Sequence, residues 1–222
     1  MDIKVLYEDN HLIAVYKPAG VLIQKGEGPG HDDNTLYWQV KQFIKKRDSK
    51  PGDVFLGVLH RLDRTVAGIV LFAKTSKGAA RLSEQFRERT IRKFYHAVVV
   101  GVPEPKEATL EHFLSKDENA KKAIVGAGEG DLSVLHYITV KSNDKNALLK
   151  IELETGRFHQ IRVQLSTIGH PIVGDTKYGA PEALSDRSIM LAATELNFKT
   201  ATTDENIKIS IEIPTEWDLL FS

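Results

Sequence analysis

Apolar and polar positions follow clear periods over much of the chain, and each period predicts an element of secondary structure. Near the N-terminus, apolar runs at 5–7 and 12–16 flank a short polar turn, which predicts two paired strands. Apolar residues then recur at helical spacing between 36 and 44, so we expect an amphipathic helix capped by Asn34 or Thr35. The chain therefore opens with a strand pair followed by a helix.

Two polar stretches adjoin this helix. Residues 25–34 are rich in glycine and predict a polar loop, without the glycine pattern of a dinucleotide or phosphate loop. Residues 41–50 contain five bases and one acid. Because such a run is usually a solvated helix face, we favour this interpretation over an RNA contact.

The next segment predicts two strands and a second helix. The apolar, β-prone run 55–62 is one strand, and 68–73 is a short continuous apolar run typical of a buried strand. Thr75 or Ser76 caps the helix that follows. Its apolar stripe consists of Ala79, Leu82 and Phe86. The polar turn between the two strands is a place where chemistry could lie.

Strands dominate the rest of the chain. Strands are predicted at 94–100, 147–153 and 207–213, and residues 115–132 are predicted to form a loop or a weak hairpin. Because strands outnumber helices without regular alternation, the class is α+β, with a central mixed, largely antiparallel sheet flanked by helices and loops. A chain of 222 residues without a visible linker predicts one domain over 1–222.

Composition narrows the possible chemistry. The chain has no cysteine, which excludes disulfides, thiolate metal sites and a cysteine nucleophile. The N-terminus does not resemble a secretion signal and no run of 18 apolar residues occurs, so we expect a cytoplasmic protein without membrane contact. The 30 basic and 30 acidic residues cancel, which by itself argues mildly against a nucleic-acid partner.

One candidate site lies at the end of the strand predicted over 55–62. The sequence His60-Arg61-Leu62-Asp63-Arg64 places a carboxylate between two arginines. Taken alone, this arrangement is equally well explained by a solvated turn with a local ion pair, since surface charge pairs are common and contribute little.

A second candidate site lies near residue 160, where a predicted strand is followed by a predicted helix. Phe158, Ile161, Leu165 and Ile168 form the predicted apolar stripe, and Arg162 lies beside it. Such an arginine should be partly buried and should therefore need an anion. Asp63 or a phosphate could supply it.

These motifs resemble those of the RluA-type pseudouridine synthases, which isomerise uridine in ribosomal or transfer RNA. The family signature His-Arg-Leu-Asp-x-x-Thr-Ser-Gly is similar to residues 60–68. The later Gly-Arg-x-His-Gln-Ile-Arg and Gly-His-Pro-Ile-x-Gly-Asp are matched at 156–162 and 169–175. The resemblance covers nearly the whole chain.

Two shorter matches and two departures complete the comparison of motifs. Residues 17–20 resemble the family's Lys-Pro-x-Gly, and 93–97 resemble its Lys-x-Tyr-x-Ala. Val66-Ala67 replaces the usual Thr-Ser, and Met190–Ala193 replaces the common Leu-Leu-His-Ala. Neither departure touches the carboxylate of Asp63, so they bear on efficiency and substrate range more than on reaction type.

The resemblance implies a pseudouridine synthase-like fold and one catalytic domain over 1–222, similar to compact relatives that lack an extra N-terminal RNA-binding domain. It implies Asp63 as the catalytic carboxylate, with Tyr95 and Arg162 as further catalytic residues and no cofactor. The residues expected to bind substrate are His60, Arg61, Arg64 and Leu191. The expected partner is RNA, and the protein is expected to be a monomer without an obligatory protein partner.

The implied reaction breaks the bond between ribose and the base nitrogen and reforms the link through a ring carbon. It requires an ionised carboxylate near the anomeric carbon, as glycoside cleavage does. The uridine must leave its stack, which costs a few kcal/mol. By resemblance, Tyr95 is the platform on which the flipped base stacks, Arg61 helps to replace the base and Leu191 lines the uracil pocket, whereas His60 orients the loop. Whether the carboxylate adds to the sugar, adds to the uracil or abstracts a proton stays open.

Two other functions compete with this interpretation. An RNA-binding or RNA-remodelling module would keep the fold with little turnover. A metal phosphohydrolase would need ligands drawn from His60, Asp63, His159, His170 and Asp175. Their spacing matches no known metal motif, so we expect no metal.

The zero net charge hides an uneven distribution. Residues 57–96 hold nine bases and three acids, whereas 204–218 hold five acids and one base. This asymmetry predicts a basic stripe beside the candidate loop that follows RNA phosphates, and binding that weakens with salt.

Overall fold

The computed structural model describes residues 3–24, 35–126 and 128–221. The polar loop expected at 25–34 and the candidate cap Asn34 lie outside these ranges. The chain forms two compact units, one made of residues 1–91 and 195–211 and the other of residues 92–194 and 212–222. They are called unit 1 and unit 2 below.

Unit 1 is built on short antiparallel strands. β1 (Val5–Glu8) and β2 (Leu12–Lys17) pair as predicted, and β2 also pairs with β4 (Ala67–Ala73). β4 is buried along almost its whole length, which confirms the interpretation of its apolar run. The C-terminal part of β10 (Leu191–Lys199) pairs with β11 (Asn206–Ser210), so the predicted strand at 207–213 is shorter than its apolar period.

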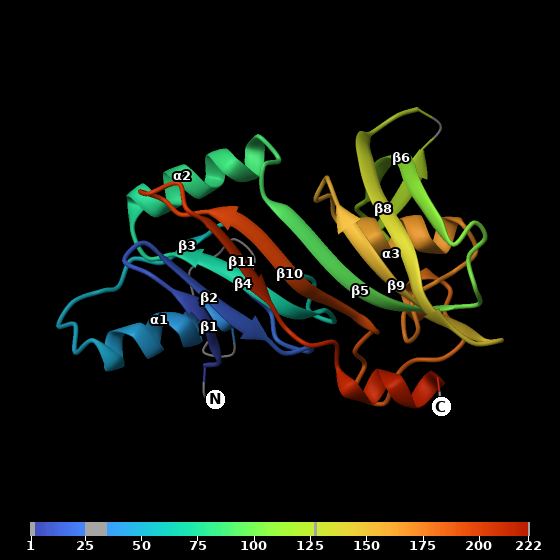
Figure 1. Ribbon diagram of the computed structural model, residues 1–222, viewed down its shortest axis with the longest axis horizontal. Coiled ribbons are helices and arrows are strands. Elements are labelled where there is room, and N and C mark those ends of the chain that lie inside the picture. Colours follow the sequence, from blue (N-terminus) through green and yellow to red (C-terminus); the bar gives the residue numbers. More distant parts are fainter. Residues whose placement is uncertain (1–2, 25–34, 127, 222) are drawn as a thin grey trace. The chain divides into compact units, whose positions relative to one another are not determined.

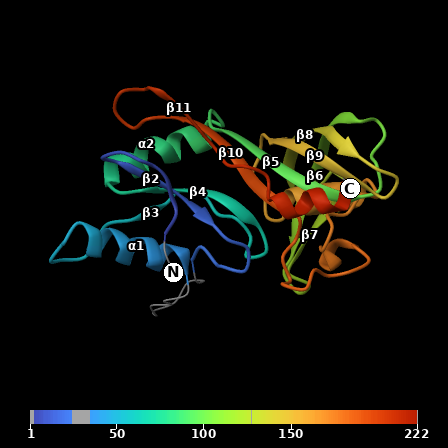
Figure 2. The ribbon, with the colours of Figure 1, turned by 60° about the horizontal axis from the view of Figure 1, so that its bottom comes forward.

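Two amphipathic helices accompany these strands. α1 (Leu36–Arg47) is capped by Thr35, whose side chain accepts from the Trp38 amide, and α2 (Ser76–Arg87) is capped in the same way by Thr75. In both views, α1 and α2 lie on opposite sides of β2 and β4 (Figures 1 and 2). The core cluster on the α2 side contains Leu82 of α2 and alternate residues of both strands: Leu12, Ala14, Ile69, Leu71 and Ala73.

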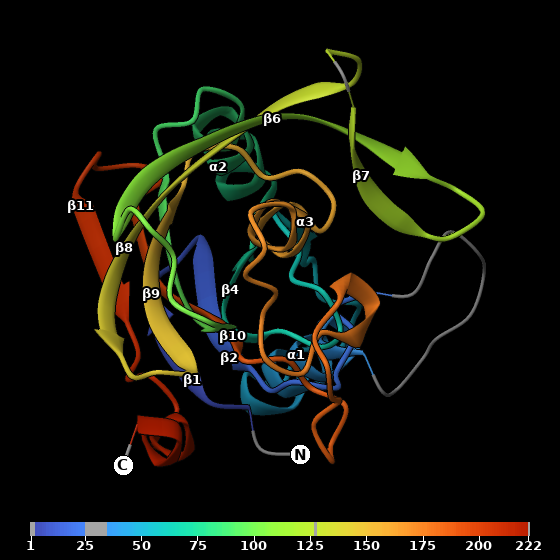
Figure 3. The same ribbon diagram turned by 90° about the vertical axis from the view of Figure 1, so that its right-hand side faces the viewer.

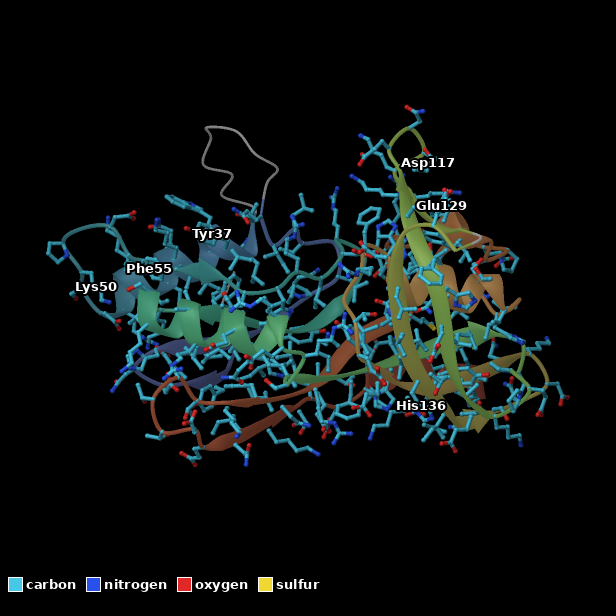
Figure 4. All side chains as sticks on the ribbon, turned by 90° about the horizontal axis from the view of Figure 1, so that it is seen from above. Tyr37, Lys50, Phe55, Asp117, Glu129 and His136 are labelled. Carbon is cyan, nitrogen blue, oxygen red and sulfur yellow. The ribbon has the colours of Figure 1, made fainter. Side chains whose placement is uncertain are left out.

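The predicted strand at 55–62 is mostly wrong. Only β3 (Gly57–Val58) pairs, and Phe55 is 51% exposed on the preceding loop, where Figure 4 labels its side chain. The amide of Leu71 in β4 donates to the His60 imidazole at 3.0 Å. A side-chain acceptor therefore takes the place of a backbone carbonyl, and the ladder stops after two residues.

Unit 2 contains a five-stranded antiparallel sheet in the order β5-β9-β8-β6-β7. β5 and β9 agree with the predicted strands. Within the segment predicted as a loop or a weak hairpin, the end of β6 pairs with β7 as a hairpin, which confirms that alternative, and the segment runs into the start of β8. The bounds are Arg92–Val100 for β5, Glu107–Asp117 for β6, Lys122–Gly126 for β7, Asp131–Ser142 for β8 and Asn146–Leu153 for β9. β6 and β8 show no clean alternation in the sequence, because Phe113 of β6 and Leu132, Ile138 and Val140 of β8 are exposed apolar residues.

The sheet of unit 2 curves around α3 (Gln160–Thr167), as Figure 3 shows. Val163 of the helix packs with Leu114 of β6 and Ala123 of β7. Phe158, which the sequence places in the apolar stripe, lies before the helix and is 42% exposed. The reason is the left-handed backbone of His159 (φ 51°), which turns the chain just before the first helical residue.

Short 3-10 helices complete the chain at η1 (Thr176–Tyr178) and η2 (Thr215–Phe221). The class is α+β, as the sequence predicts. Among the described residues, no helix combines the length and apolar character needed to cross a membrane. That residues 1–222 act as one catalytic domain stays a prediction.

Candidate active site

The loop that carries Asp63 connects β3 to β4 in unit 1. Leu62 and Val66 are buried on either side of the half-buried Asp63, whereas Arg61 and Arg64 are exposed. The two apolar side chains anchor the loop, and between them only Arg64 is exposed. Val66 stands at one of the family's hydroxyl positions, and its burial in an apolar setting explains why a methyl group is tolerated there.

Glycines and main-chain bonds fix the ends of this loop. Gly68 has a φ of 130°, a conformation that other residues rarely adopt, at the point where the loop enters β4. The Gly20 amide donates to the Arg64 carbonyl at 2.7 Å, and the Arg64 Nε donates to the Gly20 carbonyl at 2.9 Å. These two hydrogen bonds join the Lys-Pro-Ala-Gly turn to Arg64, the residue that follows Asp63.

Lys17 lies buried at the centre of this contact between the turn and the loop. Its ammonium group is fully buried and donates to the carbonyls of Val21 at 2.8 Å, Pro18 at 3.1 Å and Arg64 at 3.3 Å. Burial lowers the pKa of Lys17 from 10.5 to about 8, and the negative charge of Asp63 acts in the opposite direction. A positive charge is therefore held at the base of the candidate loop.

His60 holds the other side of the loop. Its Nε2 accepts the Leu71 amide at 3.0 Å, so the ring carries its proton on Nδ1 in this arrangement, and the ring packs against Phe86. These contacts agree with the orienting role that the sequence suggests. A role for His60 in binding substrate stays a prediction.

Arg162 in unit 2 forms a buried ion pair within its own unit. Its Nε donates to Asp175 Oδ2 at 2.7 Å and its Nη2 to Oδ1 at 2.8 Å, with both side chains almost fully buried. The sequence predicts burial and an anion but not this partner. Gly174 sets the position of Asp175: its φ is +88°, and a Cβ there would lie 2.8 Å from Leu184.

Tyr178 connects Arg162 to the start of α3. Its ring lies 4.9 Å from the Arg162 guanidinium, and its hydroxyl receives the Ala123 amide at 2.7 Å and contacts His159 Nδ1 at 2.8 Å. Tyr178 and Asp175 are the positioning residues that residue-level reasoning missed. The available signal was the Gly-Asp-x-x-Tyr-Gly run directly after the helix, because it follows the arginine and ends in a turn.

Two further predicted residues lie on strands of unit 2. Tyr95 is in β5 opposite Ile151 and is 8% exposed, and Leu191 is the buried first residue of β10. Their burial agrees with a packing role as well as with the predicted roles toward RNA. Those roles stay predictions.

The basic stripe is smaller than the sequence predicts. Lys74 pairs with Glu8, and Arg92 pairs with Glu152 at 2.8 Å. Both carboxylates lie outside residues 57–96, so a charge count over a sequence window overstates the local charge. The other exposed bases of unit 1 in this segment are Arg61, Arg64, Lys77, Arg81, Arg87 and Arg89, of which Arg81 lies 3.6 Å from Glu84 in the same helix.

The basic run at 41–50 forms ion pairs of its own. Arg47 makes a bidentate contact with Glu8 at 2.6 and 2.8 Å, and Lys41 contacts Asp53 at 2.8 Å. Pairing with Arg47 is the leading reason that the pKa of Glu8 is held below its ordinary value. This agrees with the solvated-helix interpretation.

The candidate metal ligands are engaged elsewhere. His159 contacts Tyr178, His170 Nδ1 lies 2.9 Å from the Val100 carbonyl, and Asp175 binds Arg162. Within the described ranges, no three His, Asp or Glu side chains gather as a metal site would require.

Comparison with protein families settles the class. A family model described as RNA pseudouridylate synthase matches residues 11–167, which include the Asp63 loop, Tyr95 and Arg162. The chain belongs to the RNA pseudouridylate synthase family. The predicted RluA-type family and enzyme class, an isomerase that modifies RNA, are therefore confirmed.

Curated relatives extend this match over the rest of the chain. The ribosomal large subunit pseudouridine synthase D of Zymomonas mobilis is 32% identical over 99% of this chain and 72% of its own length. The dual-specificity RNA pseudouridine synthase RluA of Vibrio cholerae is 38% identical over 88% of this chain and 77% of its own length.

A solved structure of a pseudouridine synthase domain shares the fold. The human RNA pseudouridylate synthase domain containing 4 superposes with a TM-score of 0.77 and 23% identity, covering 96% of this chain and 90% of the human one. The predicted pseudouridine synthase fold is confirmed.

Proposed function

We propose that this pseudouridine synthase isomerises a specific uridine in ribosomal or transfer RNA, with Asp63 as the catalytic carboxylate. The observation that carries this proposal is the support given to Asp63. Leu62 and Val66 anchor its loop, and the Arg64 carbonyl accepts a hydrogen bond from the buried Lys17. Such support holds a carboxylate in one geometry before substrate arrives, which an efficient catalytic group requires.

The choice of RNA follows from the names of relatives. One relative is named for the large ribosomal subunit and another for dual specificity. Ribosomal RNA and transfer RNA are therefore the two substrate classes to test. The reaction takes place in the cytoplasm, where both RNAs are made in bacteria, and the protein acts as a monomer.

The proposed roles of the remaining residues follow the family motifs. Tyr95 stacks on the flipped base and handles a proton through its hydroxyl, Arg162 is a further catalytic residue held in place by Asp175, and Leu191 lines the uracil pocket. Arg61 replaces the flipped base. His60 and Arg64 bind RNA beside Asp63, and His60 also orients the loop.

The Asp63→Asn substitution tests the proposal. We expect kcat to fall by about 10⁴-fold, the size of loss seen when an acidic catalytic residue is neutralised in a working site. Pseudouridines would be mapped across total RNA from a deletion strain that carries either version, which also identifies the RNA and the uridine. Retention of the modification in the Asp63→Asn strain would exclude Asp63 as the catalytic carboxylate.

Asp53→Asn is a matched control. Asp53 belongs to the same unit, but its side chain is exposed and pairs with Lys41. We expect full modification with this variant. If Asp63→Asn restores growth or ribosome assembly as well as the wild type does, the RNA-remodelling alternative is favoured instead.

The Tyr95→Phe substitution separates the two proposed roles of that residue. It keeps the ring but removes the hydroxyl, so a proton-handling role predicts a lower kcat at unchanged KM for RNA. Tyr95→Leu removes the aromatic platform as well, and we expect KM to rise in addition because stacking is lost.

A further inference from the structure

The turn between β9 and α3 exposes an aromatic ring that packing does not require. Gly156, Arg157 and Phe158 are all exposed, and the left-handed backbone of His159 separates them from the helix. Phe158 differs from an isolated apolar residue on the surface, because the left-handed turn that follows it presents the ring in a defined direction.

The ring of Phe158 is already oriented. It stacks on the imidazole of His159 with ring centroids 3.8 Å apart and planes inclined by 19°. The imidazole is in turn held by the Tyr178 hydroxyl, which also receives the backbone amide of Ala123. One face of the phenyl ring is therefore supported, and binding on the other face requires little loss of side-chain freedom.

Two flexible bases accompany this ring. The Lys116 Nζ lies over the ring, 5.5 Å from its centroid, so a base that stacks there displaces this ammonium group, and Arg157 precedes Phe158 in the chain. Each base has an exposed carboxylate partner, Glu118 at 2.8 Å and Asp131 at 3.2 Å. Exposed pairs of this kind contribute little to stability, so either base can exchange its carboxylate for a phosphate.

Acidic residues prevent this surface from being a simple electrostatic site. The exposed carboxylates of Glu118 and Asp131 pair with Lys116 and Arg157. Figure 4 labels two further acids of unit 2, Asp117 at the end of β6 and Glu129 between β7 and β8. A surface of mixed charge with an oriented aromatic ring favours a ligand with both a π face and a phosphate. An unpaired nucleotide has both.

We propose that Phe158, supported by His159, is a stacking platform for an unpaired base of the RNA substrate, distinct from the uridine that is isomerised. Lys116 and Arg157 contact the phosphates on either side of that base. The proposal rests on the proposed function in one respect, which is that the ligand is RNA. It adds a binding subsite that the family motifs do not assign, since the position of Phe158 is variable in the Gly-Arg-x-His-Gln-Ile-Arg signature.

The Phe158→Trp substitution reports on stacking directly. A base that stacks on the indole quenches its fluorescence, so titration with a single-stranded oligouridylate should quench this variant more strongly than the wild type, whose own tryptophans are Trp38 and Trp217. An oligomer with abasic sites carries the same phosphates and should leave the added signal unchanged. Equal quenching by both oligomers would contradict a stacking platform.

The Phe158→Ala substitution measures the contribution to binding. We expect the Kd for substrate RNA to rise about tenfold, within the range for loss of one stacked base, with a parallel rise in KM and an unchanged kcat. Phe158→Tyr should bind like the wild type and Phe158→Leu like the alanine variant, because the ring and not its apolar area is required.

Phe113→Ala is the matched control. Phe113 lies on β6 of the same unit and is 40% exposed, but nothing described in its surroundings orients it as His159 orients Phe158. Its Kd for RNA should change less than about twofold. Equal effects of the two alanine variants would overturn the proposal.

Failure of the stacking proposal is distinguishable from failure of the proposed function. If Asp63→Asn keeps full modification activity while the quenching of the Phe158→Trp variant depends on bases, the assigned chemistry is wrong and the platform stands. If modification requires Asp63 but Phe158→Ala binds RNA like the wild type, the function stands and the platform is wrong.

Discussion

The loop around Asp63 in unit 1 is held mainly by main-chain carbonyls gathered on one buried lysine, whereas Arg162 in unit 2 is held by a side chain of opposite charge. In unit 1, the Lys17 ammonium group donates to three carbonyl oxygens. In unit 2, the Asp175 carboxylate accepts two short hydrogen bonds from Arg162. Lys17 can lose its charge by releasing a proton, whereas the ion pair in unit 2 requires both Arg162 and Asp175.

This difference has a consequence for stability. A buried guanidinium that loses its carboxylate keeps its charge, because arginine does not release its proton at accessible pH. A buried ammonium whose pKa is already near 8 can become neutral instead. Unit 2 should thus be more sensitive to substitution of its anion, and unit 1 more sensitive to pH.

The largest expected effect is that of Asp175→Ala. We expect the free energy of unfolding to fall by about 3–5 kcal/mol, because the buried guanidinium of Arg162 loses the carboxylate that accepts two of its hydrogen bonds. Urea denaturation measures this. The double variant Arg162→Met with Asp175→Ala should recover part of the loss, since no buried charge remains.

An exposed pair of the same geometry provides the control. Arg92 and Glu152 also form a bidentate contact, at 2.8 and 3.0 Å, but with the arginine mostly exposed. Arg92→Ala should cost less than about 1 kcal/mol, and less still at high salt. A loss for Arg92→Ala equal to that for Asp175→Ala would show that burial does not explain the comparison.

The pH dependence of Lys17 gives the next largest effect. Between about pH 8 and 10.5 the unfolded chain keeps a proton on Lys17 that the folded chain has released, so the free energy of unfolding rises with pH over this range. The expected rise is about 3 kcal/mol relative to Lys17→Met, which lacks the titrating group. Urea denaturation at a series of pH values measures it.

Asp63 sharpens this prediction. Because its negative charge favours the protonated Lys17, Asp63→Asn should lower the pKa of Lys17 further, and the rise in stability should begin at lower pH. Lys77→Met is a control in which an exposed lysine is removed. A pH profile unchanged by Lys17→Met would contradict the assigned role of burial.

The smallest expected effect concerns Tyr178. Tyr178→Phe keeps the ring against Arg162 but removes the hydroxyl that serves both Ala123 and His159, so we expect a loss of about 1–2 kcal/mol. Tyr137→Phe, which loses one bond to the Pro105 carbonyl, should cost about half as much. A loss for Tyr178→Phe as large as that for Asp175→Ala would contradict the expectation that breaking the buried ion pair costs more than losing the hydroxyl's hydrogen bonds.

Local pattern was sufficient for some elements and misleading for others. The caps at Thr35 and Thr75 and the continuous apolar run of β4 depend on neighbours in sequence, and they agree with the predictions. β6 and β8 were not predicted, because exposed apolar residues such as Phe113, Leu132 and Ile138 interrupt the alternation of apolar and polar positions. The strand expected at 55–62 is shorter than predicted because the His60 side chain, and not a backbone carbonyl, accepts the Leu71 amide.

The sequence motifs were enough to predict the reaction class, because they place particular residue types in a fixed order and spacing, which can be read without a structure. It also located Asp63 between two arginines. Only the tertiary structure identified Asp175 and Tyr178 as the supports of Arg162, Lys17 as a fully buried charge and Phe158 as an exposed ring. Burial and ion pairing join residues that are distant along the chain, and a period read from neighbouring residues contains no information about such partners.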